Sequence, residues 1–378
     1  TLKVIEQDPD QLTKIKGITK KRAAQISEAF RRQMGTRLLL EFLTEHQLPM
    51  ELAVLLNRAY GDVALEVVRA NPYLLANQEF EVEFSQADRL ALELGVGPED
   101  PLRLEAGLIF ELAHNNQNNG HTFLPRRKLV EATSVLLDVP GDPLEDCLEA
   151  LLRRGEAECE QVAGQEAVYL PALYEAETFI AQRILEMSRT ELPPPQGLDK
   201  LIRRIEKEQR ISYAPQQREA VELAAGRQVM LLTGGPGTGK TTCLRGVLAL
   251  FEMMGLDTAL AAPTGRAAKR LGELCNTDAS TIHRLLETGF DPRSGKLVFT
   301  RNSYDPLKAN AVIVDETSMV DVPLMAALLD ALEADCRLVL VGDPDQLPSV
   351  GPGALFADLI RSGAVPTVRL TEIFRQAA

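Results

Sequence analysis

The sequence lacks the features that mark membrane, secreted and zinc-stapled proteins. No apolar run in its 378 residues reaches the roughly 18 residues that a membrane span needs, and its first residues do not follow the layout of a signal peptide. The cysteines are scattered and never form a Cys-x-x-Cys pair: Cys147, Cys159, Cys243, Cys275 and Cys336. This spacing argues against a zinc site or a disulfide framework and favours a reducing cytoplasm.

Positive charge is also scarce, since the net charge is −13. Such a balance argues against a protein that binds nucleic acid through its overall field. A negative net charge is still compatible with local binding of phosphates, because such binding depends only on the charge that lines the groove. One stretch is locally basic: between Leu12 and Arg37, eight Lys or Arg stand against one acid, Glu28. A basic helix face is usually just solvated, so this stretch alone decides little.

The chain length predicts two to four domains, and the texture of the sequence changes midway. Residues 1 to about 190 are mostly helical in pattern. The segment 192–197 then holds three consecutive prolines, which cannot continue a helix. From Gln228, short apolar runs alternate with helical stretches, which predicts a parallel α/β sheet. The predicted strands are Val229–Leu232, Thr258–Ala262, Ala311–Val314 and Leu338–Val341.

Near the start, two helical patterns are joined by Leu12–Thr19. Gly17 permits a tight turn there, and Thr19 can cap the second helix. The segment resembles a helix-hairpin-helix, a module that holds DNA phosphates through its hairpin amides, although a helical hairpin with a solvated basic face explains it equally well. A second helix–glycine–helix segment around Gly61 lacks the basic cluster, so we interpret it as structural.

Further along, three predicted helices are followed by two strand-like segments. The helices cover residues 104–112, 129–137 and 144–152, and the strands cover 156–162 and 166–170. This pattern predicts a winged-helix-like module over residues 101–190, after a helical region over residues 1–100. The acidic hairpin favours a scaffold role over DNA reading. Residues 114–121 are predicted to be a polar loop, and their two histidines lack the companions that a metal site needs.

The strongest motif is GGPGTGKTT at residues 234–242, which fits the phosphate-loop pattern G-x-x-x-x-G-K-[ST]. A predicted strand precedes it and a predicted helix follows. The backbone can curl so that successive N–H groups face the phosphates of a nucleotide, with Lys240 adding charge and Thr241 offering its hydroxyl to Mg²⁺. The predicted binding residues are Gly235, Pro236, Gly237, Thr238, Gly239, Lys240, Thr241 and Thr242.

Two further loops follow predicted strands. Asp315 and Glu316 come directly after the strand Ala311–Val314, where an open α/β sheet places its site. We expect Asp315 to hold Mg²⁺ together with Thr241, and Glu316 to polarise the attacking water. The loop GDPDQLPSVG begins at Gly342, and Gln346 within it can reach the γ-phosphate from the neighbouring strand.

These motifs, in this order and spacing, resemble those of superfamily 1 helicases. The segments APTGRAAKR from Ala262 and STIHRLL from Ser280 resemble the corresponding motifs of the RecD-like branch of these helicases. The resemblance implies 5′-to-3′ movement on single-stranded DNA, with DNA contacts at Pro263, Thr264, Arg266 and His283. It also implies that Gln217 reads the adenine edge and that Arg375 meets the γ-phosphate, so that Lys240, Glu316, Gln346 and Arg375 form the catalytic set.

The helix-hairpin-helix front half points to the stand-alone RecD-like helicases. The expected architecture is a RecA-like P-loop sheet domain over residues 191–378, preceded by the mainly helical region. A β-hairpin inserted at about residues 287–310 resembles the pin on which such helicases split a duplex fork, although an unspecialised surface hairpin remains an alternative. Its predicted turn, Asp291–Gly295, contains a proline, a serine and a glycine.

The same resemblance implies a second RecA-like domain, which these 378 residues do not contain. It further implies ATP and Mg²⁺ as cofactors, a monomer, a role in DNA repair or recombination, and a bacterial cytoplasmic location at the nucleoid. One alternative is the helicase portion of a conjugative relaxase, which the absence of a tyrosine and histidine cluster disfavours. Another is a clamp or loader that uses nucleotide as a switch, which the acid pair and Gln346 disfavour.

Overall fold

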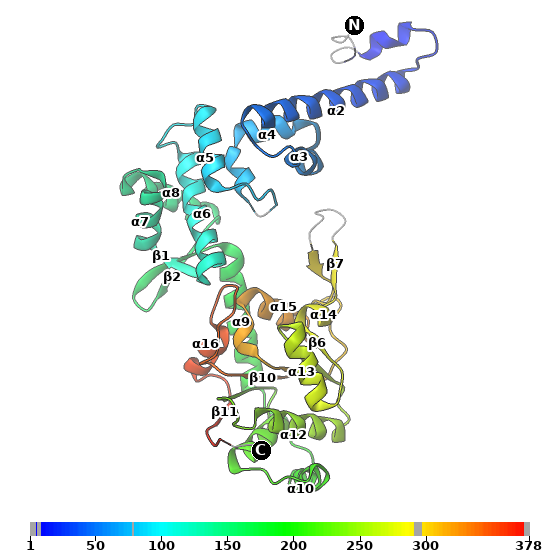
Figure 1. Ribbon diagram of the computed structural model, residues 1–378, viewed down its shortest axis with the longest axis vertical. Coiled ribbons are helices and arrows are strands. Elements are labelled where there is room, and N and C mark those ends of the chain that lie inside the picture. Colours follow the sequence, from blue (N-terminus) through cyan, green and yellow to red (C-terminus); the bar gives the residue numbers. More distant parts are fainter. Residues whose placement is uncertain (1–4, 6–8, 78, 291–296, 374–378) are drawn as a thin grey trace. The chain divides into compact units, whose positions relative to one another are not determined.

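The computed structural model describes residues 5, 9–77, 79–290 and 297–373 (Figure 1). The chain divides into two compact units. Unit 1 comprises Thr1–Leu112 and Pro125–Ala157, and unit 2 comprises Ala113–Leu124 and Glu158–Ala378. Each unit is described by itself below. None of the helices within the described ranges is both long and apolar enough to cross a membrane.

Unit 1 is helical, as predicted. Its elements are η1 (Pro9–Lys14), α2 (Lys20–Glu45), α3 (Leu52–Tyr60), η2 (Gly61–Val63), α4 (Ala64–Ala70), η3 (Pro72–Ala76), α5 (Phe84–Glu93), the first part of α6 (Pro101–Asn119), α7 (Arg126–Leu137) and α8 (Gly141–Arg154). The core gathers leucines from α2 and α3, among them Leu39, Leu43 and Leu56. Apolar side chains that recur along one helix face bury together in this way.

The predicted cap at the start of α2 is confirmed. The Thr19 hydroxyl accepts a hydrogen bond from the backbone N–H of Arg22 at 3.3 Å. Gly17 precedes it with φ +96°, a conformation that favours glycine. The first helix of the predicted helix-hairpin-helix is a short 3₁₀ turn, η1. The basic side chains of this segment that the structure describes are all exposed: Lys14, Lys16, Lys20, Lys21, Arg22, Arg31 and Arg37.

The prediction of a polar loop at residues 114–121 is wrong, because α6 continues to Asn119. Asparagine side chains bond within the helix instead of opening it. The Asn118 amide donates to the carbonyl of His114 at 3.1 Å, and the Asn119 amide donates to the side-chain oxygen of Asn115 at 2.9 Å. The helix ends where Gly120 takes φ +68°.

In unit 2, a three-stranded sheet has the order β1-β3-β2, and we call it the wing sheet. Its strands are β1 (Phe123–Pro125), β2 (Glu158–Val162) and β3 (Gln165–Tyr169). Strands β2 and β3 pair antiparallel, with a turn at Ala163 and Gly164, so the predicted hairpin is confirmed. The three-part division at residues 100 and 190 stays a prediction, and its bounds do not coincide with those of the two units.

The main sheet of unit 2 has six strands in the order β11-β4-β10-β9-β5-β6, and every pairing is parallel. The strands are β4 (Val229–Gly234), β5 (Thr258–Ala262), β6 (Ala279–Thr281), β9 (Ala311–Val314), β10 (Arg337–Gly342) and β11 (Thr367–Leu370). The parallel α/β fold expected from the four apolar runs is confirmed. Strands β6 and β11 close its two ends.

Helices cover both faces of this sheet. Successive residues of a strand point to opposite faces, so each strand contributes side chains to two cores. Val229 and Leu231 join one core with α9 (Pro171–Arg189), α15 (Val322–Asp330) and α16 (Leu355–Ser362). Met230 and Leu232 join the other core with α10 (Leu198–Gln209), α11 (Pro215–Gly226), α12 (Lys240–Met253) and α13 (Gly265–Cys275). Such two-sided burial explains why β4 is apolar throughout.

The short helix α14 (Ile282–Leu285) leads into a hairpin of β7 (Thr288–Phe290) and β8 (Leu297–Phe299). The two strands pair antiparallel, with Thr288 opposite Phe299. The hairpin predicted within about residues 287–310 is therefore present. Its predicted turn, Asp291–Gly295, lies outside the described residues.

Candidate nucleotide site at the carboxyl edge of the sheet

The parallel sheet brings the predicted motifs to one edge. The glycine-rich loop follows β4, Asp315 follows β9, and Asp343 follows β10, which lies between these two strands. Carboxyl ends of parallel strands share one edge, and ligands of open α/β sheets bind there. The three loops therefore start from neighbouring strands although they are distant in sequence.

The glycine-rich loop is shaped by its backbone. Gly237 and Gly239 have φ of +77° and +89°, and Gly239 precedes the first residue of α12. A side chain on Gly234 would come within 2.6 Å of the Thr238 hydroxyl, which itself donates to the Gly235 carbonyl at 2.8 Å. The loop thus leads directly into the start of α12. The first N–H groups of this helix have no partner within the helix, which makes them suitable for binding phosphate.

Lys240 is held by this same loop. Its ammonium donates to the carbonyls of Gly234 and Gly235, the latter at 3.1 Å. Thr241 and Thr242 follow it on the first turn of α12 and are both partly exposed. The positive charge therefore already lies at the mouth of the loop, where a phosphate would replace the carbonyls as its partner.

Asp315 lies in the interior of the carboxyl edge. Its backbone N–H donates to Ala261 of the neighbouring strand at 2.9 Å, and its carboxylate accepts the N–H of Glu316 at 2.9 Å. Burial raises the pKa of Asp315, and the charge of Glu316 adds to this, while that N–H, Lys240 and Arg270 oppose it. The influence of Lys240 indicates that the glycine-rich loop and this acid act on each other electrostatically.

Glu316 has a backbone conformation that glycine favours, with φ +53°. The next residue holds the bend, because the buried Thr317 hydroxyl donates to the Val314 carbonyl at 3.0 Å. A non-glycine residue in this region costs of order 1–3 kcal/mol, and such strain gathers at functional sites. At this bend the backbone leaves the direction of β9. Glu316 is partly exposed there.

The loop after β10 is built around Asp343, which is only 4% exposed. Its carboxylate accepts the N–H of Asp345 at 3.2 Å and the side-chain amide of Gln346 at 3.4 Å. Gln346 itself is exposed at the edge. The sequence predicted a role for Gln346 but not for Asp343, whose carboxylate holds the loop. The position of Asp343 at the end of a predicted strand was the signal that could have revealed it.

Gln217 is buried, and its side-chain oxygen accepts the N–H of Ala214 at 3.1 Å, which caps α11. Its predicted contact with an adenine edge stays a prediction. The neighbouring Gln216, which the sequence did not single out, accepts the N–H and the hydroxyl of Thr371 at 3.0 and 3.2 Å. It thereby binds α11 to the end of β11. Arg375 lies outside the described residues.

The predicted DNA-contact residues follow β5 and β6, at one end of the sheet. Thr264 caps α13 by accepting the N–H of Ala267 at 3.2 Å, next to a partly exposed Pro263. Arg266 and His283 are exposed, and the His283 ring lies 5.7 Å from that of Phe299 at the hairpin. Thr264 therefore has a structural role here, and the two exposed side chains are available to a ligand.

The donor set is compatible with Mg²⁺ bound together with a nucleotide. Thr241 and Asp315 offer hard oxygen ligands, and a cation would offset the cost of burying the Asp315 charge. In the ranges that the structure describes, no cluster of three or more His, Cys, Asp or Glu could hold a metal by itself. Phosphate oxygens and water would have to complete the shell, as is usual for Mg²⁺.

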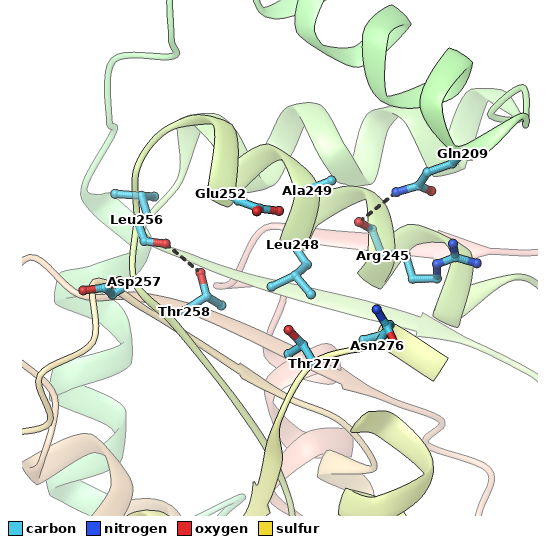
Figure 2. A pocket seen from close by; sticks show the side chains of 11 residues that line it. Gln209, Arg245, Leu248, Ala249, Glu252, Leu256, Asp257, Thr258, Asn276 and Thr277 are labelled. Atoms are coloured by element: carbon cyan, nitrogen blue, oxygen red, sulfur yellow. Dashed lines mark hydrogen bonds between the residues drawn. The ribbon is translucent and has the colours of Figure 1, made fainter. Parts of the chain in front are cut away.

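A separate pocket of about 470 Å³ opens beside the amino end of β5. Figure 2 shows it between α10, α12 and the end of α13, with the Gln209 amide donating to the Arg245 carbonyl at 3.2 Å. The Thr258 hydroxyl donates to Leu256 at 3.3 Å on its opposite side. None of the motif residues lines it, so it is distinct from the edge described above.

Fold and site together define a phosphate-loop nucleotide-binding domain. The family models agree: residues 217–352 match the AAA domain, and residues 32–123 match the ATP-dependent RecD2 DNA helicase HHH domain. The chain is thus related to the RecD2-type DNA helicases. The second match begins after Leu12–Thr19 and includes the segment around Gly61, which the sequence alone had presented as merely structural.

Individual proteins show the same relation. The chain is 34% identical to the ATP-dependent RecD2 DNA helicase of Deinococcus radiodurans, over 99% of this chain and 52% of that protein. It is 44% identical to the RecBCD enzyme subunit RecD of Mycolicibacterium smegmatis, over 38% of this chain and 30% of that protein. The chain therefore spans about half the length of the first relative and less of the second.

A solved structure of the Pif1 helicase from Candida albicans is 26% identical and covers 44% of this chain and 41% of its own, with a TM-score of 0.33. That score is too low to support a conclusion about the fold. The similarity to RecD2-type helicases rests on the sequence matches.

Proposed function

We propose that the protein is an ATP-dependent DNA helicase of the RecD type. One observation carries the proposal: the phosphate loop, the acids after β9 and the Asp343–Gln346 loop gather at one sheet edge of a chain similar to a RecD2 helicase along 99% of its length. Such a set serves phosphoryl transfer, in which positioning and charge stabilisation do most of the work.

Each side chain has a role that its surroundings support. The N–H groups at the start of α12 and the Lys240 ammonium bind the phosphates of ATP. Glu316 accepts a proton from the attacking water, a role that is compatible with the partial exposure of this residue at the bend. Gln346 contacts the γ-phosphate from the next strand. Thr241 and Asp315 would hold Mg²⁺, which would neutralise negative charge on the phosphates.

The finer proposal is 5′-to-3′ translocation on single-stranded DNA, with the β7–β8 hairpin at the duplex fork. The loops after β5 and β6 would hold the strand through Arg266 and His283. Exposed apolar side chains at the carboxyl edge, Leu347, Val350 and Ile373, support a second RecA-like domain closing over the nucleotide with Arg375 at the cleft. Action in DNA repair or recombination, as a monomer at the bacterial nucleoid, completes the proposal.

The test uses the full-length protein and the Lys240→Ala variant. Loss of the ammonium removes charge from the γ-phosphate, so we expect steady-state ATP hydrolysis to fall by about 10²-fold or more. Lys200→Ala, an exposed lysine on α10, is the matched control. DNA-stimulated hydrolysis in the wild type and strand separation on a forked duplex complete the assay. A wild-type protein that binds ATP without hydrolysing it would favour a nucleotide switch.

A further inference from the structure

Three segments of unit 2 meet at a junction that the motifs do not include. Gly353, in the loop after β10, donates its N–H to the carbonyl of Gly120, the residue that follows α6, at 2.9 Å. Val322, the first residue of α15, donates its N–H to Pro352 at 3.0 Å. We call Gly120, Gly351 and Gly353 the glycine junction.

The two loop glycines of the junction, Gly351 and Gly353, have no room for side chains. Gly353 has φ +99°, and a methyl group there would overlap the Val322 side chain. A methyl group on Gly351 would overlap the Asp321 carboxylate, which caps α15 by accepting the N–H of Leu324 at 2.9 Å. The Ser349 hydroxyl lies within hydrogen-bonding distance of the carbonyls of both loop glycines, at 2.9 and 2.8 Å.

On one side the glycine junction continues into the catalytic loops. Gln346 lies just before Ser349 in the same loop, and Glu316 lies one short turn, η4 (Thr317–Met319), before the start of α15. A shift of the junction must therefore move one or both of the segments that present the proton acceptor and the γ-phosphate contact. Among the residues that the structure describes, no backbone hydrogen bond joins the glycine-rich loop after β4 to the junction.

On the other side the glycine junction continues into the wing sheet. Thr122 lies two residues after Gly120 and is buried, and its side chain hydrogen-bonds with Glu177 of α9. Glu177 also hydrogen-bonds with Tyr169 of β3. The next residue after Thr122, Phe123, begins β1. The wing sheet is thus connected to the junction both along the chain and through the side chains of Thr122, Glu177 and Tyr169, of which Glu177 is partly buried.

We propose that the glycine junction sets the positions of Glu316 and Gln346 relative to the wing sheet, so that a displacement of the wing sheet changes the rate of ATP hydrolysis but not the affinity for ATP. This proposal rests on the proposed function. Rate is sensitive because a shift of about 1 Å at reacting groups can cost about 10²-fold. Affinity is insensitive because the phosphates are held chiefly by the separate loop after β4.

The test introduces Gly351→Ala into the full-length protein. We expect kcat for DNA-stimulated ATP hydrolysis to fall about tenfold or more, while the Kd for a fluorescent ATP analogue changes less than about twofold. Adding Asp321→Ser should restore most of the rate, because serine can still cap α15 and leaves space for the methyl group. Thr122→Val, which removes the hydroxyl on the wing side, should lower kcat in the same direction.

Gly353→Ala and Gly363→Ala form a matched pair, since both place alanine at positive φ but Gly363 has no neighbour within 4 Å. Only the first should reduce kcat. A folded Gly351→Ala protein with wild-type kcat would overturn the junction proposal alone, as would a parallel loss of affinity or a failure of Asp321→Ser to restore the rate. If the wild-type protein hydrolyses no ATP, the proposed function fails as well.

Discussion

At the scale of single residues, the αL conformation of Glu316 links stability to activity. Its φ of +53° is unfavourable for any residue with a Cβ, whereas glycine adopts it freely. We expect Glu316→Gly and Glu316→Ala both to reduce ATP hydrolysis by about 10²- to 10⁴-fold, because each removes the proton acceptor. The glycine variant should nevertheless be the more stable of the two by about 1 kcal/mol in urea unfolding.

Glu316→Gln separates binding from chemistry, because it keeps the length of the side chain and most of its shape. We expect it to bind ATP with Mg²⁺ normally and to hydrolyse it about 10²- to 10⁴-fold more slowly. Affinity and turnover are measured independently, by equilibrium titration and by phosphate release. Collapse of affinity with normal turnover of whatever nucleotide remains bound would assign Glu316 a binding role instead.

At the scale of elements, α9 carries a carboxyl group whose burial makes unit 2 sensitive to pH. Burial raises the pKa of Glu177, and the charges of Asp358 and Glu160 add to it, against hydrogen bonds from Thr122 and Tyr169. A raised folded-state pKa means that stability is fully present below the ordinary glutamate range and is lost as pH rises through the folded value.

Replacing Glu177 by Gln should therefore raise Tm by a few degrees at pH 8, because the amide stays neutral and can still accept a hydrogen bond. The difference from wild type should disappear below the ordinary pKa range of glutamate. Thermal unfolding followed by circular dichroism, from about pH 3, below the ordinary glutamate range, to pH 8, measures it. A difference that does not depend on pH would show that the effect comes from packing and not from ionisation.

The elements differ in how far the sequence predicts them. Strands β5 and β9 have the predicted bounds, because strands buried on both faces are continuous apolar runs. The outer strands β6 and β11 were missed, since β11 alternates exposed and buried residues and β6 is only partly buried. The phosphate loop was predicted because its backbone demands particular residues. The contact between Gly120 and Gly353 leaves no trace in local sequence, so only the fold reveals it.

At the scale of the whole molecule, the question is whether the basic start of the chain contacts DNA. Lys14, Lys16 and Lys21 are exposed, yet the net charge is −13. If the three side chains neutralise phosphates, changing them to Gln should weaken single-stranded DNA binding and flatten its salt dependence by about 0.7 in log K per log salt for each contact. Fluorescence anisotropy at several salt concentrations gives the slope.

The control changes Lys128, Lys200 and Lys207, which are equally exposed, so that both variants lose the same charge. If the slope falls equally in both variants, only the overall charge of the protein matters for DNA binding. A slope that falls only in the first variant would locate a DNA contact in the segment from η1 to the first turn of α2. If neither slope changes, the basic helix face is simply solvated.

The common direction of the strands in the six-stranded sheet also indicates where a label can be attached to the molecule. All proposed chemistry begins at the carboxyl ends of the strands, so the opposite edge is available for attachments. Asp257, Asn310 and Asp335 lie at or near the starts of β5, β9 and β10 and are exposed. A dye or surface tether introduced there would lie away from the loops that we propose to bind nucleotide, which suits single-molecule measurements.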